Sequence, residues 1–274
     1  MDFVKMHGLG NDFIIVEVPT WESVDKLQSE ARWMCDRNFG IGADGLVMIG
    51  KDPELDVFMR IFNSDGTEPE MCGNAIRCIA KYAYENELTD KRIMAVRTLA
   101  GVRNPELIME NGSVSAVRVD MGEPILERSL IPMSGDGSNV NIPIHIEDQQ
   151  FNITAVSVGN SHCVIFVDDI NQVLVDKWGP QLEVNPLFPA KTNVEFVQVI
   201  SENELIMRVW ERGAGITLAC GTGSCATLVA SILNGYTKRA ATIHLLGGDL
   251  FIEWENDQHV YMTGPATEVF KGTL

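Results

Sequence analysis

Two cysteines of this chain lie in short phrases of nearly the same composition. Cys72 begins the phrase Cys-Gly-Asn, and Cys220 begins the phrase Cys-Gly-Thr. A helical pattern follows each phrase, so we expect each cysteine where a strand or loop passes into a helix. The unpaired N–H groups of a first helical turn favour thiolate and lower the pKa of a cysteine there. Two equivalent thiols facing one carbon suit a reaction that removes a proton from one face and returns one to the other.

The residues after each cysteine predict a site for an anion. Gly73 and Gly221 have no Cβ, so a ligand can approach the backbone closely. The backbone N–H groups of the helix ends would hold a carboxylate, and Asn74 and Thr222 would add side-chain donors. Removing a proton α to that carboxylate develops negative charge on it, which such donors stabilise as an oxyanion hole does.

Polar residues at the ends of two equivalent strands are candidates for holding the rest of a substrate. Arg212 is a natural bidentate partner for a carboxylate, and Glu211 suits an ammonium group. Together they indicate an amino acid. Asn63 stands at the matching place of the first half, although Asn-Ser-Asp-Gly is also ordinary turn chemistry and Glu211-Arg212 could be a surface pair. Neutral hydrogen bonds would come from Asn11, Asn160 and Asn193. His7 and His162 lie near the glycines of these phrases, either in the pocket or in the core.

The cysteine phrases belong to a duplication of the whole chain. At the offset that relates Cys72 to Cys220, Asn86 also corresponds to Asn234. Further pairs follow in the same order at this offset or one residue from it: Phe58–Asn63 with Ile206–Glu211, Gly10-Asn11 with Gly159-Asn160, and Leu99–Gly101 with Leu246–Gly248. The run of matches indicates two homologous halves.

Many short strands and few helices predict an α+β fold, with a mixed or antiparallel sheet wrapped around one central helix in each half. The two domains are expected to be pseudo-symmetric, with the active site in a cleft between them. The first is expected over residues 1–119 with a returning tail, 265–274, and the second over 120–264. Helices are predicted at 23–38, 74–86, 171–175 with an extension toward Gly179, and 221–233, and strands at 13–18, 46–49, 57–62, 93–96, 107–109, 114–119, 153–158, 164–167, 194–200, 205–210, 242–246, 250–255 and 260–262. Residues 127–150 are expected to form a loop.

Composition limits the function classes. A chain of 274 residues with 45% hydrophobic residues is expected to form two globular domains. Its net charge of −17 argues against nucleic acid as a partner. The N-terminal sequence has no signal-peptide pattern and no apolar run is long enough to span a bilayer, so a cytoplasmic protein without a membrane partner is expected.

The cysteine count favours free thiols. Six cysteines in a large chain without an export signal are not expected to form disulfides. Their spacing lacks the pattern of a zinc site, so no metal is expected. The four cysteines outside the two phrases are expected to pack as small hydrophobes: Cys35, Cys78, Cys163 and Cys225.

At these residues the chain closely resembles diaminopimelate epimerases. The motifs that carry the resemblance run in order over nearly the whole chain: His7–Phe13, Gly40–Gly45, Phe62–Gly66, Glu70–Asn74, Gly159-Asn160, Trp210–Gly213 and Ala219–Gly223. The resemblance implies a homodimer that interconverts LL- and meso-2,6-diaminopimelate without pyridoxal phosphate or another cofactor. This reaction leads to lysine and peptidoglycan precursors.

The resemblance also assigns roles to residues. It implies that Cys72 and Cys220 are the acid/base pair. Substrate-binding residues carried over by motif are Asn11, Asn63, Gly73, Asn74, Asn160, Asn193, Glu211, Arg212, Gly221 and Thr222. Three positions depart from the family pattern: Ala75 stands where Gly is frequent, Ser161 where Pro is frequent, and Gly45 where some members have Gln.

Other functions stay open from the residues alone. Related two-thiol racemases act on histidine or proline-type amino acids, which lack a second amino acid head. A cysteine hydrolase would leave the second equivalent cysteine without a role. In a non-enzymatic redox or ligand-binding module, Cys72 and Cys220 would form a reversible disulfide.

Overall fold

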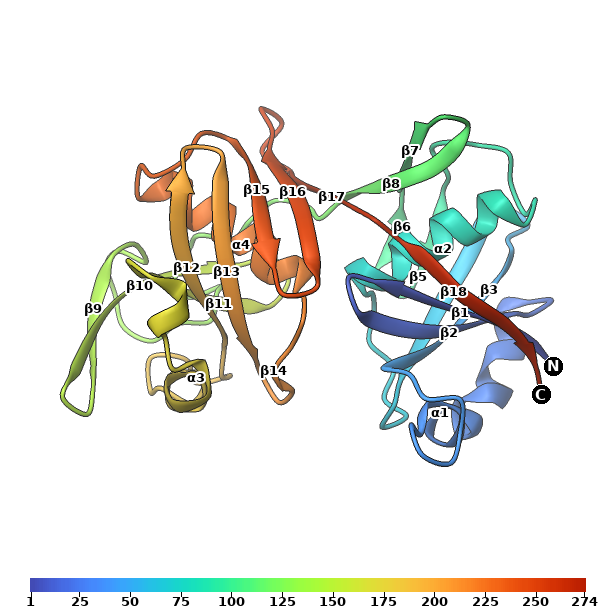
Figure 1. The fold of residues 1–274 in the computed structure, drawn as a ribbon, viewed down its shortest axis with the longest axis horizontal. Coiled ribbons are helices and arrows are strands. Elements are labelled where there is room, and N and C mark those ends of the chain that lie inside the picture. The colour runs from blue at the N-terminus through green and yellow to red at the C-terminus, as the bar shows by residue number, and fades with distance from the viewer. The chain divides into compact units, whose positions relative to one another are not determined.

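The computed structural model describes residues 1–274 and shows two compact units (Figure 1). The first unit consists of Met1–Asp120 and Thr263–Leu274, and the second of Met121–Met262. The strands form two sheets, one of seven and one of eleven strands, and each unit has one long helix that begins directly after a cysteine. No helix is both long and apolar enough to cross a membrane.

The sheet of the first unit has the strand order β18-β1-β2-β3-β4-β5-β6. From β1 to β6, neighbouring strands alternate between antiparallel and parallel pairing, beginning with the antiparallel pair β1–β2. The strands are β1 (Asp2–Gly8), β2 (Asn11–Glu17), β3 (Gly45–Lys51), β4 (Val57–Asn63), β5 (Val96–Thr98), β6 (Gly101–Arg103) and β18 (Thr267–Thr273). A hairpin of β7 (Glu106–Glu110) and β8 (Ser113–Asp120) completes the unit.

The second unit repeats the same alternation. Along β10-β11-β12-β13-β15-β16 the pairs are again antiparallel, parallel, antiparallel, parallel and antiparallel. This agreement in topology confirms the two repeats expected from the sequence. The strands are β10 (Gln149–Ser157), β11 (Ser161–Phe166), β12 (Asn193–Ser201), β13 (Glu204–Glu211), β15 (Ala240–Leu245) and β16 (Gly248–Trp254), with β9 (Ile142–Ile146), β14 (Gly215–Ile216) and β17 (Val260–Gly264) as additions.

The two long helices hold equivalent places, and the α+β class is confirmed. In the first unit α2 (Gly73–Glu85) packs against β1, β2, β4, β7 and β8. In the second unit α4 (Gly221–Leu233) packs on the sheet, against β10 to β13, β15 and β16. Residues Gly223–Ser231 of α4 are all buried, as expected of a helix that a sheet encloses.

Both helices end at the duplicated asparagines. The Asn86 side-chain amide donates to the Tyr82 carbonyl at 3.0 Å, and that of Asn234 donates to the Ala230 carbonyl at 2.8 Å. In each case the side-chain amide adds a second hydrogen bond to a carbonyl that already accepts one from the backbone N–H of the same asparagine. The Asn234 amide also donates to Thr154 Oγ1 of β10 at 2.9 Å, which ties the helix end to the sheet.

The C-terminal tail packs on the first unit. β18 pairs with β1 in antiparallel register, from Asp2 opposite Thr273 to His7 opposite Thr267. The buried Arg77 of α2 donates from Nε to the Pro265 carbonyl at 3.2 Å, which fixes the start of the tail.

Several expected elements are wrong in extent. The helix expected at 23–38 is a 3-10 helix, η1 (Trp21–Leu27), followed by α1 (Gln28–Cys35), because Ser23 does not cap a helix but bonds Thr20. The helix expected from residue 171 toward Gly179 is divided into η2 (Ile170–Gln172) and α3 (Val175–Glu183). The expected loop 127–150 contains β9, which pairs with β10. The strand expected at 93–96 begins only at Val96, and β1, β6, β14 and β18 were not predicted.

Candidate active site

Each cysteine of the duplicated phrases is the N-cap residue of its helix. Cys72 precedes α2 with φ −137° and ψ 119°, and Cys220 precedes α4 with φ −127° and ψ 112°. The first helical hydrogen bonds also match, because Ile76 N donates to the Cys72 carbonyl and Ser224 N to the Cys220 carbonyl, both at 3.0 Å. The expected placement of both cysteines at helix starts is confirmed.

In the second unit, the Cys220 sulfur is buried against the first turn of α4. The Gly223 N–H donates to Sγ at 3.3 Å, and Thr222 Oγ1 lies 3.6 Å from Sγ. These two contacts favour thiolate, as expected at a helix N-terminus. Burial is the larger effect, however, and together with the negative charges of Glu211 and Glu195 it raises the pKa of Cys220 well above its ordinary value. The expected lowering of this pKa is therefore wrong, because local helix geometry does not reveal how deeply the thiol is buried.

Glu211 lies at the end of β13 in the neighbourhood of Cys220. Its Oε1 accepts a hydrogen bond from Thr217 Oγ1 at 2.5 Å. Thr217 follows β14, which turns back along the end of β13 and pairs with Trp210 and Glu211. Sequence reasoning missed Thr217, because a single threonine in a loop carries no motif.

In the first unit, the Cys72 sulfur lies 4.0 Å from Asn11 Oδ1. Asn74 Nδ2 donates to the same oxygen at 3.0 Å, and Asn11 Nδ2 donates to Asp44 Oδ2 at 2.7 Å. Because a carboxylate only accepts hydrogen bonds, Asp44 fixes the Asn11 amide with its oxygen toward Cys72. The structure thus brings together three residues predicted for the site, and it adds Asp44.

A charged cluster holds the strand that carries Asn11. Asp12 forms ion pairs with Lys5 Nζ and Arg37 Nη2, both at 2.7 Å, and Arg37 also pairs with Asp44 at 2.7 Å. Burial raises the pKa of Asp12, but hydrogen bonds from Arg37 and Lys5 outweigh it and lower this pKa to about 2. Asp12 therefore stays ionised and keeps the end of β2 in place.

Asn63 ends β4 beside the turn that the sequence predicted. Its Nδ2 donates to Thr67 Oγ1 at 3.0 Å, and Gly66 closes the turn with φ 82°. Gly45 is the register partner of Asn63 on β3. A Cβ at Gly45 would lie 3.0 Å from the Phe62 carbonyl oxygen, so a side chain there needs a small shift of the neighbouring strand.

Asn193 uses both ends of its amide within the protein. Nδ2 donates to the Ser161 carbonyl at 2.9 Å, and Oδ1 accepts from the Arg212 backbone N–H at 3.0 Å. Arg212 itself donates from Nη1 to the Ala190 carbonyl at 3.0 Å. Ser161, one of the three positions that depart from the pattern of the resemblance, bonds through its hydroxyl to Thr192 at 2.9 Å. The buried Ser161 hydroxyl therefore has a hydrogen-bond partner in the buried Thr192.

Asn160 belongs to a buried chain of polar groups that the sequence did not predict. Its Oδ1 lies 2.8 Å from His162 Nε2, and His162 Nδ1 lies 2.7 Å from Glu195 Oε1. His162 and Glu195 have no exposed surface. Of the two open interpretations of His162, the structure therefore shows a core histidine with partners on both nitrogens.

Part of the set predicted for the site meets at the start of the long helix in each unit, whereas Asn63, Asn160 and Asn193 have their hydrogen-bond partners elsewhere. In the first unit, Asn11, Asn74 and Cys72 meet at the start of α2, with Gly73 as its first residue. In the second unit, Thr222 and Cys220 meet at the start of α4, with Gly221 as its first residue. Each group offers a thiol, which can transfer a proton, and backbone N–H donors, which can bind a carboxylate beside it.

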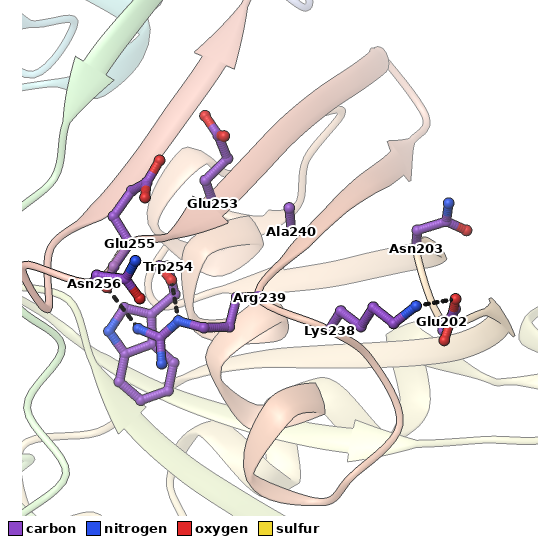
Figure 2. Close-up of a pocket in the computed structure, with 9 residues that line it drawn as sticks. All are labelled: Glu202, Asn203, Lys238, Arg239, Ala240, Glu253, Trp254, Glu255 and Asn256. Atoms are coloured by element: carbon purple, nitrogen blue, oxygen red, sulfur yellow. Dashed lines mark hydrogen bonds and ion pairs between the residues drawn. The ribbon is translucent and has the colours of Figure 1, made fainter.

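A surface cavity in the second unit lies apart from these residues. It has a volume of about 400 Å³, and Figure 2 shows Arg239 against the ring of Trp254 and Lys238 paired with Glu202 along its wall. Neither Cys220 nor any other residue predicted for the site lines it.

The fold is that of a known group of two-domain proteins. A phenazine biosynthesis protein of the PhzF family from Bacillus anthracis superposes with a TM-score of 0.72 at 15% identity, over 99% of this chain and 98% of that chain. A hydroxyproline epimerase from Agrobacterium vitis superposes with a TM-score of 0.69 at 14% identity, over 99% of this chain and 91% of that chain. These structural similarities place the chain in a class of two-domain proteins that share this fold.

Sequence comparison identifies the family within that class. Residues 3–127 and 154–269 match the diaminopimelate epimerase family. A diaminopimelate epimerase of Pelotomaculum thermopropionicum is 56% identical over 278 residues, which cover 99% of this chain and 98% of the relative. The chain belongs to the diaminopimelate epimerase family.

Proposed function

We propose that the protein interconverts LL-2,6-diaminopimelate and meso-2,6-diaminopimelate, with Cys72 and Cys220 as the two acid/base groups and without pyridoxal phosphate. The observation that carries the proposal is the duplication of the cysteine-capped helix, with nearly the same backbone geometry at both cysteines. Membership of the family and 56% identity to a diaminopimelate epimerase support the choice of substrate.

The reaction needs one thiolate and one thiol at the same α-carbon. The thiolate sulfur takes the α-proton, and the electron pair of the C–H bond passes to the substrate carboxylate. The other thiol then gives its proton to the opposite face of the carbon, which inverts the centre and leaves that sulfur as thiolate. The two sulfurs have exchanged protonation states, so the pKa values that govern turnover belong to the pair.

The helix ends stabilise the charge that develops. We assign the reacting carboxylate to the backbone N–H groups around Gly73 and Gly221, with Asn74 and Thr222 as side-chain donors. Each removed donor of this kind costs about 100- to 1,000-fold in rate in a well-formed oxyanion site.

The remaining predicted residues bind the amino acid groups. Glu211 is assigned to an ammonium group and Arg212 to a carboxylate, chiefly at the end of the substrate that does not react. Asn11, Asn63, Asn160 and Asn193 add neutral hydrogen bonds. For Asn193 the remaining N–H of Nδ2 is the group for a ligand, because Oδ1 already accepts from Arg212 N.

Solvent deuterium incorporation tests the function. The reduced protein is incubated with LL-diaminopimelate in D2O, without added pyridoxal phosphate or metal, and the α-proton is followed by NMR. Loss of that signal with appearance of the meso isomer is expected. No exchange under reducing conditions would contradict the proposal that diaminopimelate is the substrate. Proline-type amino acids and histidine would then be tried as substrates. A thiol-redox or ligand-binding module would exchange none of them.

We also propose the cellular setting that the family implies. The product serves lysine synthesis and peptidoglycan precursors, and the enzyme works in the cytoplasm as a homodimer. Light scattering of the purified full chain tests the oligomeric state, and a monomer at micromolar concentration would contradict it.

A further inference from the structure

The second unit contains a buried pair of titratable groups that the proposed proton transfer does not use. Glu195 on β12 and His162 on β11 both have no exposed surface, and their Oε1 and Nδ1 atoms lie 2.7 Å apart. The parallel pairing of these strands, with Val164 opposite Glu195, brings the two side chains together. Burying such groups costs several kcal/mol unless they are paired and bonded. Only one carboxylate oxygen is satisfied, since Glu195 Oε2 is buried without a partner.

The hydrogen bonds of His162 determine where its protons are. Nε2 faces the Asn160 amide oxygen at 2.8 Å, which accepts only, so Nε2 must carry a hydrogen. A second proton lies between Nδ1 and Glu195 Oε1. The pair of Glu195 and His162 is thus neutral overall with two protons.

This arrangement fixes the direction of the Asn160 amide. Because Oδ1 is turned toward His162, the two N–H donors of Nδ2 point away from the ring. Asn160 is only partly buried, and its Nδ2 donates to no protein group. Its donors are therefore left for a ligand.

We propose that Glu195 is a positioning residue that sets, through His162, which end of the Asn160 amide meets the substrate, and so selects an anionic group there. The inference rests on the proposed function, because it takes Asn160 as a substrate contact. With N–H donors outward, Asn160 binds a carboxylate. If Nε2 lost its hydrogen, the amide would turn its Nδ2 to the ring and present Oδ1, which repels a carboxylate.

The surroundings of Glu195 act on its pKa in both directions. Burial raises the pKa of Glu195, His162 lowers it, and the charge of Glu211 raises it further. Two thiols are also among the titratable groups around it, because the Glu195 charge raises the pKa of both Cys220 and Cys163.

Two variants of Glu195 separate this role from a structural one. In Glu195→Gln the amide N–H donates to Nδ1, so Nε2 keeps its hydrogen. We expect the KM of this variant to stay within about threefold of that of the natural protein. In Glu195→Met nothing bonds Nδ1, and we expect KM to rise roughly 10- to 100-fold, as for loss of a hydrogen bond to a charged group, with a smaller change in kcat.

The experiment measures KM and kcat for LL-diaminopimelate for all three full-length proteins. In parallel, NMR of protein labelled with ¹⁵N-histidine reads the protons on His162, assigned with His162→Gln. Protonated Nε2 in the natural protein and in Glu195→Gln supports the proposal. Bare Nε2 in the natural protein at neutral pH overturns it, as does a Glu195→Met variant whose KM is unchanged. Absence of any epimerisation by the natural protein would refute the proposed function instead, and the NMR result would still decide the state of His162.

Discussion

Gly223 is the position where one added methyl group tests the geometry around Cys220. A Cβ built there would lie 2.7 Å from Glu195 Oε1 and 3.1 Å from Cys220 Sγ, while ordinary contacts begin at 3.4 Å. The carboxylate would have to move by about 0.7 Å and the sulfur by about 0.3 Å. Gly223 lies inside α4, where alanine is the better helix former by about 1 kcal/mol. The helix therefore tolerates the substitution, and only the contacts oppose it.

Gly223→Ala is expected to affect both rate and stability. Overpacking costs about 1–3 kcal/mol, and the helix gain offsets about 1 kcal/mol, so the folded state should lose at most about 2 kcal/mol. Displacing a reacting group by 1 Å costs on the order of 100-fold, so a shift of the sulfur by about 0.3 Å should lower kcat roughly fourfold. Deuterium exchange in D2O measures the rate, and urea unfolding measures the stability.

A second substitution checks that the clash with Glu195 is the cause. In a Glu195→Ala background the added methyl group finds space, so Gly223→Ala should cost at least about 1 kcal/mol less stability than in the natural protein. The same cost in both backgrounds, or a Gly223→Ala variant with natural rate and stability, would refute the reasoning.

Three further predictions concern charge and thiol chemistry. Cys72→Ser and Cys220→Ser should each abolish epimerisation with an unchanged circular dichroism spectrum, and near-natural turnover in either would refute the two-thiol assignment. Glu211→Gln removes a negative charge that raises the pKa of Cys220, so alkylation of Cys220, followed by mass spectrometry in a Cys72→Ser background, should begin at lower pH; an unchanged onset would contradict this. Asp12→Asn should cost on the order of 2 kcal/mol in urea unfolding at pH 7, because the pKa of Asp12 is lowered to about 2. That stability is present above the unfolded value near 3.8 and is lost as pH falls through about 2, so an equal cost at pH 7 and pH 2 would argue against it.

The sequence predicted features that depend on short local signals. Each cysteine was expected at a helix start, and Asn86 and Asn234 were expected to end the helices, because caps are set by residues within one turn. The duplication could be recognised from the sequence because both halves have kept their motifs in the same order. The agreement in strand pairing between the units confirms that reading.

Features that depend on strand register could not be predicted in the same way. Glu195 reads as one polar residue within a strand, and its partner His162 lies far away in the sequence. Only the parallel pairing of β11 with β12 brings the two together. The ion pairs of Asp12 with Lys5 and Arg37 likewise join β1, β2 and the segment after α1. Strand β1 was missed because Lys5 and His7 interrupt its apolar residues, while the structure buries Lys5 with a partner.

The duplicated cysteines share a backbone geometry but differ in their chemical surroundings. In the first unit, Cys72 Sγ faces an acceptor, Asn11 Oδ1, and the nearby Asp12 is neutralised by Lys5 and Arg37. In the second unit, Cys220 Sγ receives a backbone N–H, but two carboxylates, Glu211 and Glu195, raise its pKa. The repeats have therefore kept the helix start and diverged in charge.

This difference in surrounding charge determines the protonation state of Cys220 in the protein without substrate. A thiol whose pKa burial and two carboxylates raise well above the ordinary value is protonated at neutral pH, so in the proposed reaction Cys220 is the acid before substrate binds. The reaction direction in which Cys220 acts as base then requires that binding first lowers its pKa. An ammonium group placed at Glu211 cancels the largest of the charges that raise this pKa, so the substrate itself would prepare the thiolate that attacks it. A diaminopimelate analogue that lacks the ammonium group assigned to Glu211 should therefore fail to exchange its α-proton through Cys220 even when its carboxylate is bound.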